Sequence, residues 1–339
     1  MTPERLAAFL ATVEPDTPAR VRSCRFLPGG YSRTTAVADI EWSDGRVEAV
    51  VLRGDPPLES GVFTSDRDAE WTLLRAIWDA AAVPVPRPRW YDSDGTTLGT
   101  KCMVSDRCPG PSLHEMLGAG GDQGRGTELF LAALVSVHRA PLSALPEQLL
   151  PDTGGDDYLE GALEVFDRLA ETVAGAGPVL RHVGETLRRR RPPPVPLTLV
   201  HGDWQPGNVL VPDDGPPLVI DWEFAHVGDP REDLGYYLQI PMEPHLYRRD
   251  PEGYLARYRE LTGLTREQVN PDVLQWFLVL GTTRVLLQMV QAADAVAQGR
   301  PRGVLATYLI NAVSHFHSLY LDAARRVEAT SWPVSGSPR

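Results

Sequence analysis

The first hundred residues change from a strand pattern to a helix pattern and back. Residues 21–53 alternate as VRSCRFL, TTAVADIEW and VEAVVLR, separated by the turn sequences PGGYS and SDG, which predicts three strands. A helical period follows over residues 66–82, with Ser65 as the expected N-cap. TKCMVS, residues 100–105, predicts a further strand. We therefore expect residues 20–105 to form a small sheet with one helix.

The pattern becomes mainly helical after RCPGPS. We place the hinge between two lobes near residues 105–110, with an N-lobe over 1–105, a C-lobe over 106–330 and a flexible tail over 331–339. We expect long helices in this C-lobe. They cover residues 112–140, 156–175, 178–191, 230–240, 252–261, 270–298 and 303–328.

The helix expected over residues 66–82 places a carboxylate on its apolar side. Glu70 shares that face with Leu74 and Ile77. An unpaired buried carboxylate is costly, so Glu70 needs a cationic partner.

Composition and charge narrow the classes of function. The net charge of −12 disfavours nucleic-acid binding and suits a neutral or cationic ligand. Cys24, Cys102 and Cys108 form no CxxC pair, which favours a reducing compartment over a disulfide framework. The N-terminus lacks a signal-peptide pattern, and no apolar run approaches the ~18 residues needed to span a bilayer. We expect a cytoplasmic protein that binds no membrane.

The segment LVHGDWQPGNVLV, residues 199–211, places polar side chains in a short break between apolar runs. VLV and LVID then flank the turn PDDGPP, which predicts an antiparallel hairpin. A hairpin returns the chain to its starting end, so Asn208 before the first strand and Asp221 after the second should lie side by side. Asp203 precedes Asn208 by five residues on the same loop.

These side chains are suited to a metal ion and a proton. An amide oxygen and a carboxylate at the mouth of a hairpin suit a hard cation such as Mg²⁺, with Asn208 and Asp221 as ligands. The carboxylate of Asp203 is then left to handle a proton. The alternative is that Asp203 and Asn208 only shape a turn, as isolated Asp and Asn residues usually do.

HGDWQPGN, followed by VIDWEFAHVGDPREDL, closely resembles the signature of the aminoglycoside phosphotransferase and choline kinase superfamily. Its three parts, H-G-D-x4-N, I-D-W and G-D-P-x-x-D-L, occur in order and at the expected spacing. The resemblance implies an α+β, two-lobed protein-kinase-like fold. Its N-lobe would be a small antiparallel sheet with one helix, and its C-lobe would be larger and mainly helical.

The resemblance also implies roles for residues of the C-lobe. Asp203 would orient or accept the proton of the acceptor hydroxyl, while Asn208 and Asp221 would hold Mg²⁺ on the phosphates of ATP or GTP. The site would be supported structurally by His201, Asp229 and Asp233. Asp229 and Asp233 are equally compatible with a simple role in starting the next helix.

The N-lobe would contribute the nucleotide-binding groups. By the resemblance, Gly29, Gly30 and Ser32 cover the phosphates. The backbone of Ser105 and Arg107 faces adenine. The only lysine is Lys101, so the phosphate-binding cation expected in VVLR must be Arg53, paired with Glu70.

Together these features predict an ATP-dependent O-phosphotransferase for a small-molecule hydroxyl acceptor. Two alternatives stay open: a catalytically weak kinase-like binding protein, because an arginine replaces the lysine, and a metallophosphoesterase. The residues identify neither the acceptor nor the oligomeric state, and they leave antibiotic modification and ordinary metabolism both possible.

A stripe of acidic residues gives one hint about the acceptor. Glu160, Glu164 and Asp167 follow one helical face of LEGALEVFDRLAE. Such a stripe is usually a solvated surface. Because relatives that resemble this chain often bind cationic acceptors against acidic helices, we expect an acceptor with an amine.

Overall fold

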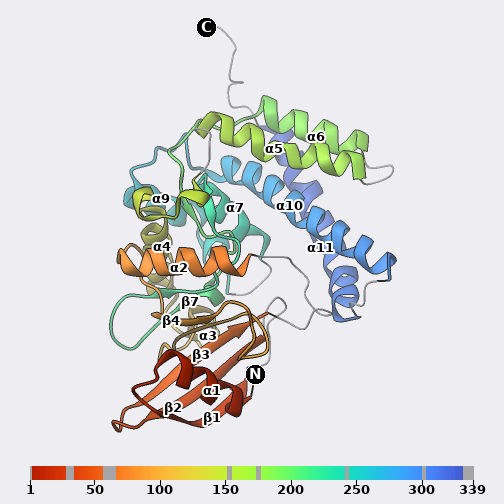
Figure 1. The fold of residues 1–339 in the computed structure, drawn as a ribbon. Coiled ribbons are helices and arrows are strands. Elements are labelled where there is room, and N and C mark those ends of the chain that lie inside the picture. Colours follow the sequence, from red (N-terminus) through yellow and green to blue (C-terminus); the bar gives the residue numbers. More distant parts are fainter. Residues whose placement is uncertain are drawn as a thin grey trace.

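The sheet and the helical region occupy opposite ends of the molecule (Figure 1). The structure is a computed structural model, and both the α+β class and the placement of the sheet near the N-terminus are as predicted. It describes residues 2–27, 34–55, 66–150, 155–172, 177–240, 244–299 and 303–330. The segment expected to be a flexible tail, 331–339, lies outside the described residues.

The N-terminal sheet has five strands in the order β1-β2-β3-β5-β4, and every neighbouring pair is antiparallel. The strand that comes last in the sequence, β5, ends at Asp106, within the range expected for the hinge. The strands are β1 (Ala19–Phe26), β2 (Thr34–Trp42), β3 (Val47–Gly54), β4 (Pro88–Asp92) and β5 (Cys102–Asp106).

Two helices accompany this sheet. In α1 (Pro3–Val13), Thr2 is the N-cap and Pro3 opens the first turn, where its fixed φ suits a helix. In α2 (Arg67–Asp79) the N-cap is Asp66, whose carboxylate accepts from two backbone N–H groups. The cap was expected at Ser65, which lies outside the described residues. Asp66 stabilises the helix start more than a serine would, because its ionised carboxylate also interacts favourably with the helix dipole.

The C-terminal region contains the predicted helices, with one division. The helix expected over 112–140 is broken at Gly120, which adopts φ of 87°, and Asp122 caps the second part. The helices of this region are α3 (Leu113–Gly118), α4 (Gln123–His138), α5 (Gly155–Thr172), α6 (Gly177–Arg189), α7 (Arg231–Gln239), α8 (Leu246–Arg249), α9 (Pro251–Thr262), α10 (Pro271–Ala297) and α11 (Gly303–Ala329), with 3₁₀ turns η1 (Leu142–Ala144), η2 (Glu147–Leu149) and η3 (Pro206–Asn208).

Two short antiparallel strand pairs frame the segment that carries the polar motifs. The predicted hairpin forms as β7 (Val209–Leu210) and β8 (Leu218–Val219). A second pair, not predicted, joins β6 (Thr198–Val200) to β9 (His226–Gly228). The loop between β6 and η3 is thus held at both ends by strands.

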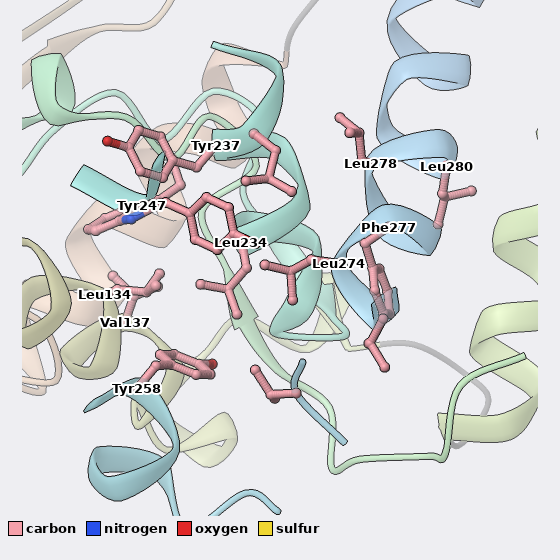
Figure 2. Packing of buried hydrophobic residues seen from close by; sticks show 14 of the residues in the cluster. Leu134, Val137, Leu234, Tyr237, Tyr247, Tyr258, Leu274, Phe277, Leu278 and Leu280 are labelled. Carbon is pink, nitrogen blue, oxygen red and sulfur yellow. The ribbon is translucent and has the colours of Figure 1, made fainter. Parts of the chain in front are cut away.

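The larger hydrophobic core gathers around α7. Figure 2 shows Leu234 of α7 lying between Val137 of α4 and Leu274 of α10, and all three side chains are buried. Burying a leucine-sized side chain contributes roughly 1.5–3 kcal/mol, so this contact fixes α7 firmly. Only two residues separate helix α7 from β9, which pairs with β6 at the start of the polar segment, so the core also positions that segment.

No helix among the residues that the structure describes is both long and apolar enough to cross a membrane.

Arg231 connects α7 to the surrounding C-terminal elements. Its side chain is fully buried and forms an ion pair of 2.6 Å with Asp229. Its Nη1 also donates to the carbonyls of Pro193 and Gln268, at 2.9 and 3.0 Å. The guanidinium stacks over the ring of Phe277 at 4.8 Å. Arg231 therefore joins three separate segments through one buried cation.

Substitution Arg231→Met should lower the free energy of unfolding by about 3–5 kcal/mol, because it leaves the buried carboxylate of Asp229 unpaired. Urea unfolding monitored by circular dichroism measures this loss. The matched control is Arg188→Met, which removes exposed ion pairs to Glu160 and Asp167 and should cost at most about 1 kcal/mol. Equal losses in the two variants would contradict the connecting role of Arg231.

Candidate active site

The loop that follows β6 is fixed by one buried carboxylate on α7. Asp233 accepts the backbone N–H of His201 at 2.9 Å and that of Gly202 at 2.8 Å. Its Oδ2 also lies 3.0 Å from Nε2 of His138 on α4. Burial alone would raise the pKa of Asp233, but the hydrogen bond and charge of His138 hold this pKa below its ordinary value. Of the two motif aspartates, Asp233 is the one that binds the backbone of the loop.

Asp229 has a different partner. Its carboxylate binds the side chain of Arg231 and accepts the backbone N–H of the same residue at 3.0 Å. This is the helix-start role that the sequence left open.

His201 and Gly202 give the loop its shape. The fully buried His201 ring contacts the rings of Trp204 and Trp222, and its Nε2 is 2.9 Å from the carbonyl of Ile220, just after the hairpin. Gly202 has φ of 80°, and a Cβ there would lie 2.4 Å from the carbonyl oxygen of Phe224. A side chain at position 202 is therefore excluded sterically.

Asp203 points into a set of neutral hydrogen-bond donors. Nε2 of Gln205 donates to Oδ1 at 2.9 Å, and Nδ2 of Asn208 donates to Oδ2 at 2.8 Å. The side chain of Tyr236 is a further hydrogen-bond partner. Burial and the negative charge of Asp221 nevertheless raise the pKa of Asp203 above its ordinary value. A carboxylate with a raised pKa accepts a proton more readily.

Asp221 lies at the end of the hairpin in a strained backbone conformation. Its φ of 70° is in the left-handed region, which costs a non-glycine residue energy and is typical of functional sites. Asn208 and Asp221 flank the same hairpin, and the N–H of Ile220 donates to the carbonyl of Asn208 at 3.0 Å. The juxtaposition predicted from the hairpin is therefore present.

Arg53 of β3 reaches across to Asp221 with an ion pair of 2.6 Å. Burial alone would lower the pKa of Arg53, but the charges of Asp221 and Glu70 keep it above its ordinary value. The ion pair of Glu70 itself is to Arg67, at 2.8 Å on the same helix. The ion pairs formed are therefore Arg53 with Asp221 and Arg67 with Glu70, and the expected partner Arg53 is close enough for the charge of Glu70 to act on it. Arg67 lies one helical turn from Glu70. The need of Glu70 for a cation is met as predicted.

Of the other residues expected to bind the nucleotide, the structure describes only Ser105 and Arg107. Ser105 lies in β5, between Val51 of β3 and Pro88 of β4. The N–H of Arg107 donates to the carbonyl of Ala49 at 3.0 Å, so this group extends the sheet and is not presented to a base. The expected phosphate-covering residues lie outside the described part of the chain: Gly29, Gly30 and Ser32.

The donor set fits a magnesium ion that also binds phosphates. Nδ2 of Asn208 donates to the carbonyl and to the carboxylate of Asp203. The other atom of the Asn208 amide, the oxygen Oδ1, therefore points away from Asp203. This oxygen and the carboxylate of Asp221 are the hard ligands that Mg²⁺ prefers. Within the described residues, no group of three or more His, Cys, Asp or Glu side chains could hold a metal. Mg²⁺ commonly uses only one or two carboxylates together with substrate phosphates.

A cavity of about 400 Å³ opens beside the loop. Gly202, which precedes Asp203, and Tyr236, which hydrogen-bonds to Asp203, both form part of its wall. Further wall residues come from α5, α7 and α10, and the surface of the cavity is mainly apolar. The cavity is therefore separated from Asp203 by no more than its chain neighbour Gly202 and its hydrogen-bond partner Tyr236.

The acidic stripe on α5 is neutralised by arginines. Glu160 and Asp167 both bind Arg188 at 2.8 Å, and Glu160 also pairs with Arg191. Glu164 lies 3.9 Å from Arg168. None of the three acidic residues lines the cavity described above. The structure therefore does not bring the stripe to the site, and its geometry is that of a balanced surface.

Several residues of the site were not found from the sequence. Tyr236 could have been, because it lies three residues after Asp233 and so on a neighbouring part of the same helix face. Tyr158 and Arg284 could not, because they come from separate helices without a motif. Their contacts with Glu232 arise only when α5, α7 and α10 pack together.

Comparison with known proteins places this geometry in context. Residues 23–277 match the model of the family described as "Phosphotransferase enzyme family". The chain is 27% identical over 240 residues to acyl-CoA dehydrogenase family member 11 of Gallus gallus, which covers 65% of this chain and 30% of that protein. The chain thus spans less than a third of the curated relatives that it matches.

Solved structures show the fold. A candidate aminoglycoside phosphotransferase from Ralstonia eutropha JMP134 superposes with a TM-score of 0.68 at 18% identity, covering 97% of this chain and 99% of the other. A thermostable mutant of aminoglycoside phosphotransferase APH(4)-Ia, in a ternary complex with AMP-PNP and hygromycin B, gives 0.62 at 16% identity, with coverage of 96% and 99%.

The kinase-like fold implied by the sequence motifs is therefore confirmed. The family model covers most of the chain, including the loop with Asp203, the hairpin with Asp221 and the buried anchor Asp233. The chain belongs to the phosphotransferase enzyme family.

Proposed function

We propose that this phosphotransferase moves the γ-phosphoryl group of ATP to a hydroxyl group of a small molecule, with Asp203 as the proton acceptor. One observation carries the proposal: the negative charge of Asp221, which pairs with Arg53, acts on Asp203, and two residues beside Asp203, Gly202 and Tyr236, line the cavity. An acceptor in the cavity and a nucleotide at that pair would meet at Asp203.

The proposed reaction balances as a single displacement. The acceptor oxygen forms a bond to the γ-phosphorus, and the bond from that phosphorus to the β–γ bridging oxygen breaks, which releases ADP. The hydroxyl proton goes to the carboxylate of Asp203. Gln205 and Asn208 orient this carboxylate through hydrogen bonds from their amide N–H groups. Catalysis would consist mainly of positioning and charge stabilisation.

The phosphates would be held by charges from both lobes. Arg53 supplies a guanidinium, which can bind phosphate oxygens through two parallel hydrogen bonds. Asn208 and Asp221 would hold Mg²⁺, which when bound neutralises charge on the phosphates. Because Arg53 contacts Asp221 directly, nucleotide binding would require Arg53 to exchange a carboxylate for phosphate.

The first prediction concerns the proton acceptor. Asp203→Asn should lower kcat about 10²–10⁴-fold, the usual contribution of a positioned proton acceptor, while the Kd for AMP-PNP stays within a few-fold. Product analysis by ³¹P NMR, with the best substrate from a panel of hydroxylated compounds, measures the loss. Asp213→Asn, in the exposed hairpin turn, is the matched control and should behave as the unmodified protein. Retained turnover in Asp203→Asn would remove this residue from the reaction.

The second prediction concerns pH. Because the pKa of Asp203 is raised, the acidic limb of kcat/KM should lie above the ordinary range of an aspartate, and activity should fall as pH drops through it. The hydrogen bond from Tyr236 lowers this pKa, so Tyr236→Phe should move the limb to higher pH. A limb that stays in place, or moves to lower pH, would show that Tyr236 does not act on Asp203.

The third prediction concerns Arg53. Arg53→Ala should weaken binding of ATP by about ten- to a hundred-fold, because hydrogen bonds to charged groups contribute roughly 1.5–3 kcal/mol. Arg53→Lys should restore part of this affinity, since it keeps the charge but loses the bidentate geometry. Titration calorimetry measures both, and Arg46→Ala in the exposed β2–β3 turn serves as control. Unchanged affinity in Arg53→Ala would mean that another residue binds the phosphates.

A further inference from the structure

The wall of the cavity beside Asp203 is largely apolar. Its hydrophobic side chains come from α10, from the residue after α7 and from the segment after β8, and two of them, Phe277 and Leu280, are seen on α10 in Figure 2. The apolar wall consists of Phe224, Ile240, Phe277, Leu280 and Val285. A ligand that fills this volume gains most from an apolar body.

A buried amide is among the polar groups of this wall. Gln239, the last residue of α7, lines the cavity with only 1% of its surface exposed. Neither Oε1 nor Nε2 of its side chain has a hydrogen-bond partner among the residues that the structure describes. Buried polar side chains nearly always have partners, so an unsatisfied amide in a cavity wall points to a ligand that completes it.

The neighbouring helix leaves room for this amide. Gly281 lies inside α10, where glycine weakens a helix relative to alanine. A Cβ at position 281 would lie 2.6 Å from Nε2 of Gln239, which is closer than any real contact. The absence of a side chain at 281 therefore permits the position of the Gln239 amide.

The acidic group in the wall is already paired, whereas Nε2 of His226 forms no hydrogen bond in the described part of the chain. Glu232 accepts from the hydroxyl of Tyr158 at 2.5 Å and forms an ion pair with Arg284. The backbone N–H of Asp229 donates to the same carboxylate at 3.3 Å, and Nε2 of His226 lies 3.5 Å away. Within the described wall this is the one carboxylate, and it is balanced by Arg284. The wall therefore offers no excess negative charge to a cationic ligand.

We infer that the acceptor is an uncharged, mainly apolar alcohol that carries a carboxamide-like group, and that Gln239 recognises this group by donating one hydrogen bond and accepting another. This inference rests on the proposed phosphotransfer and names its substrate class. It replaces the amine-bearing acceptor expected from the acidic stripe, which lies away from the cavity. Gln239 is a specificity-determining residue here, because it binds the acceptor and takes no part in proton transfer.

A matched series of compounds tests the inference. The probes are eight-carbon chains with one hydroxyl group at each possible position and one of four ends: carboxamide, methyl, ammonium or carboxylate. Binding is measured by titration calorimetry in the presence of AMP-PNP and Mg²⁺, and phosphorylation by mass spectrometry with ATP. We expect a hydroxyoctanamide to give the highest kcat/KM, about ten- to a hundred-fold above the matching octanol.

Two variants of the full chain assign the preference to Gln239. Gln239→Leu should reduce kcat/KM for the hydroxyoctanamide to that of the octanol, leave KM for ATP unchanged and leave Tm equal or higher, because an unsatisfied amide is removed. Gly281→Ala should also weaken the amide preference by displacing the amide. The control is Gln268→Leu, which removes hydrogen bonds to Thr265 and Pro194 and should lower Tm.

The outcomes separate the inference from the proposed function. If an aminooctanol or a hydroxyoctanoate is the best acceptor, phosphotransfer stands and the inferred substrate class is overturned. Binding of no member of the series also overturns it, as does an amide preference that survives in Gln239→Leu. If the hydroxyoctanamide binds selectively through Gln239 but is never phosphorylated, the recognition by Gln239 is supported and the proposed phosphotransfer fails.

Discussion

The carboxylate of Asp233 holds two consecutive backbone N–H groups, those of His201 and Gly202, inside the core of the C-terminal region. The first residue not held in this way is Asp203, so its position depends on that buried anchor. Helix α7 carries the anchor, and its own position is set by packing against α4 and α10 and by the buried cation of Arg231. Apolar packing thus determines where a polar, reactive side chain lies.

A second constraint joins the sheet to the helical region. Arg53 extends from β3 to Asp221, and both side chains are about one fifth exposed. At such a site the attraction between opposite charges is stronger than at the surface, yet both groups remain within reach of a polar ligand. In the proposed function, a nucleotide would separate this ion pair: Arg53 would bind the phosphates, and Asp221 would bind Mg²⁺. The ion pair would then keep both groups close to their working positions before the nucleotide binds.

The sequence predicted the parts of the site that depend on local order along the chain. The hairpin that brings Asn208 to Asp221 follows from two short apolar runs and a turn. The sequence was therefore enough to predict that two antiparallel strands form there. The pairing of Glu70 could not, because choosing between Arg53 and Arg67 requires the distance between β3 and α2. The cavity was also beyond prediction, since Gln239 and Gly281 meet only when α7 and α10 pack together. The acidic stripe on α5 suggested a site for a cationic acceptor for a related reason. The arginines that neutralise the stripe come mainly from α6 and the residues after it, so the stripe's own sequence does not show them.

The most direct test of the account is a crystal structure of the chain with AMP-PNP and Mn²⁺, with the metal located by anomalous scattering. The account predicts Mn²⁺ bound by Oδ1 of Asn208 and the carboxylate of Asp221, and Arg53 moved onto the phosphates. It also predicts the γ-phosphate facing Asp203, with the cavity beyond it. A nucleotide bound elsewhere, with Arg53 still paired to Asp221, would contradict it.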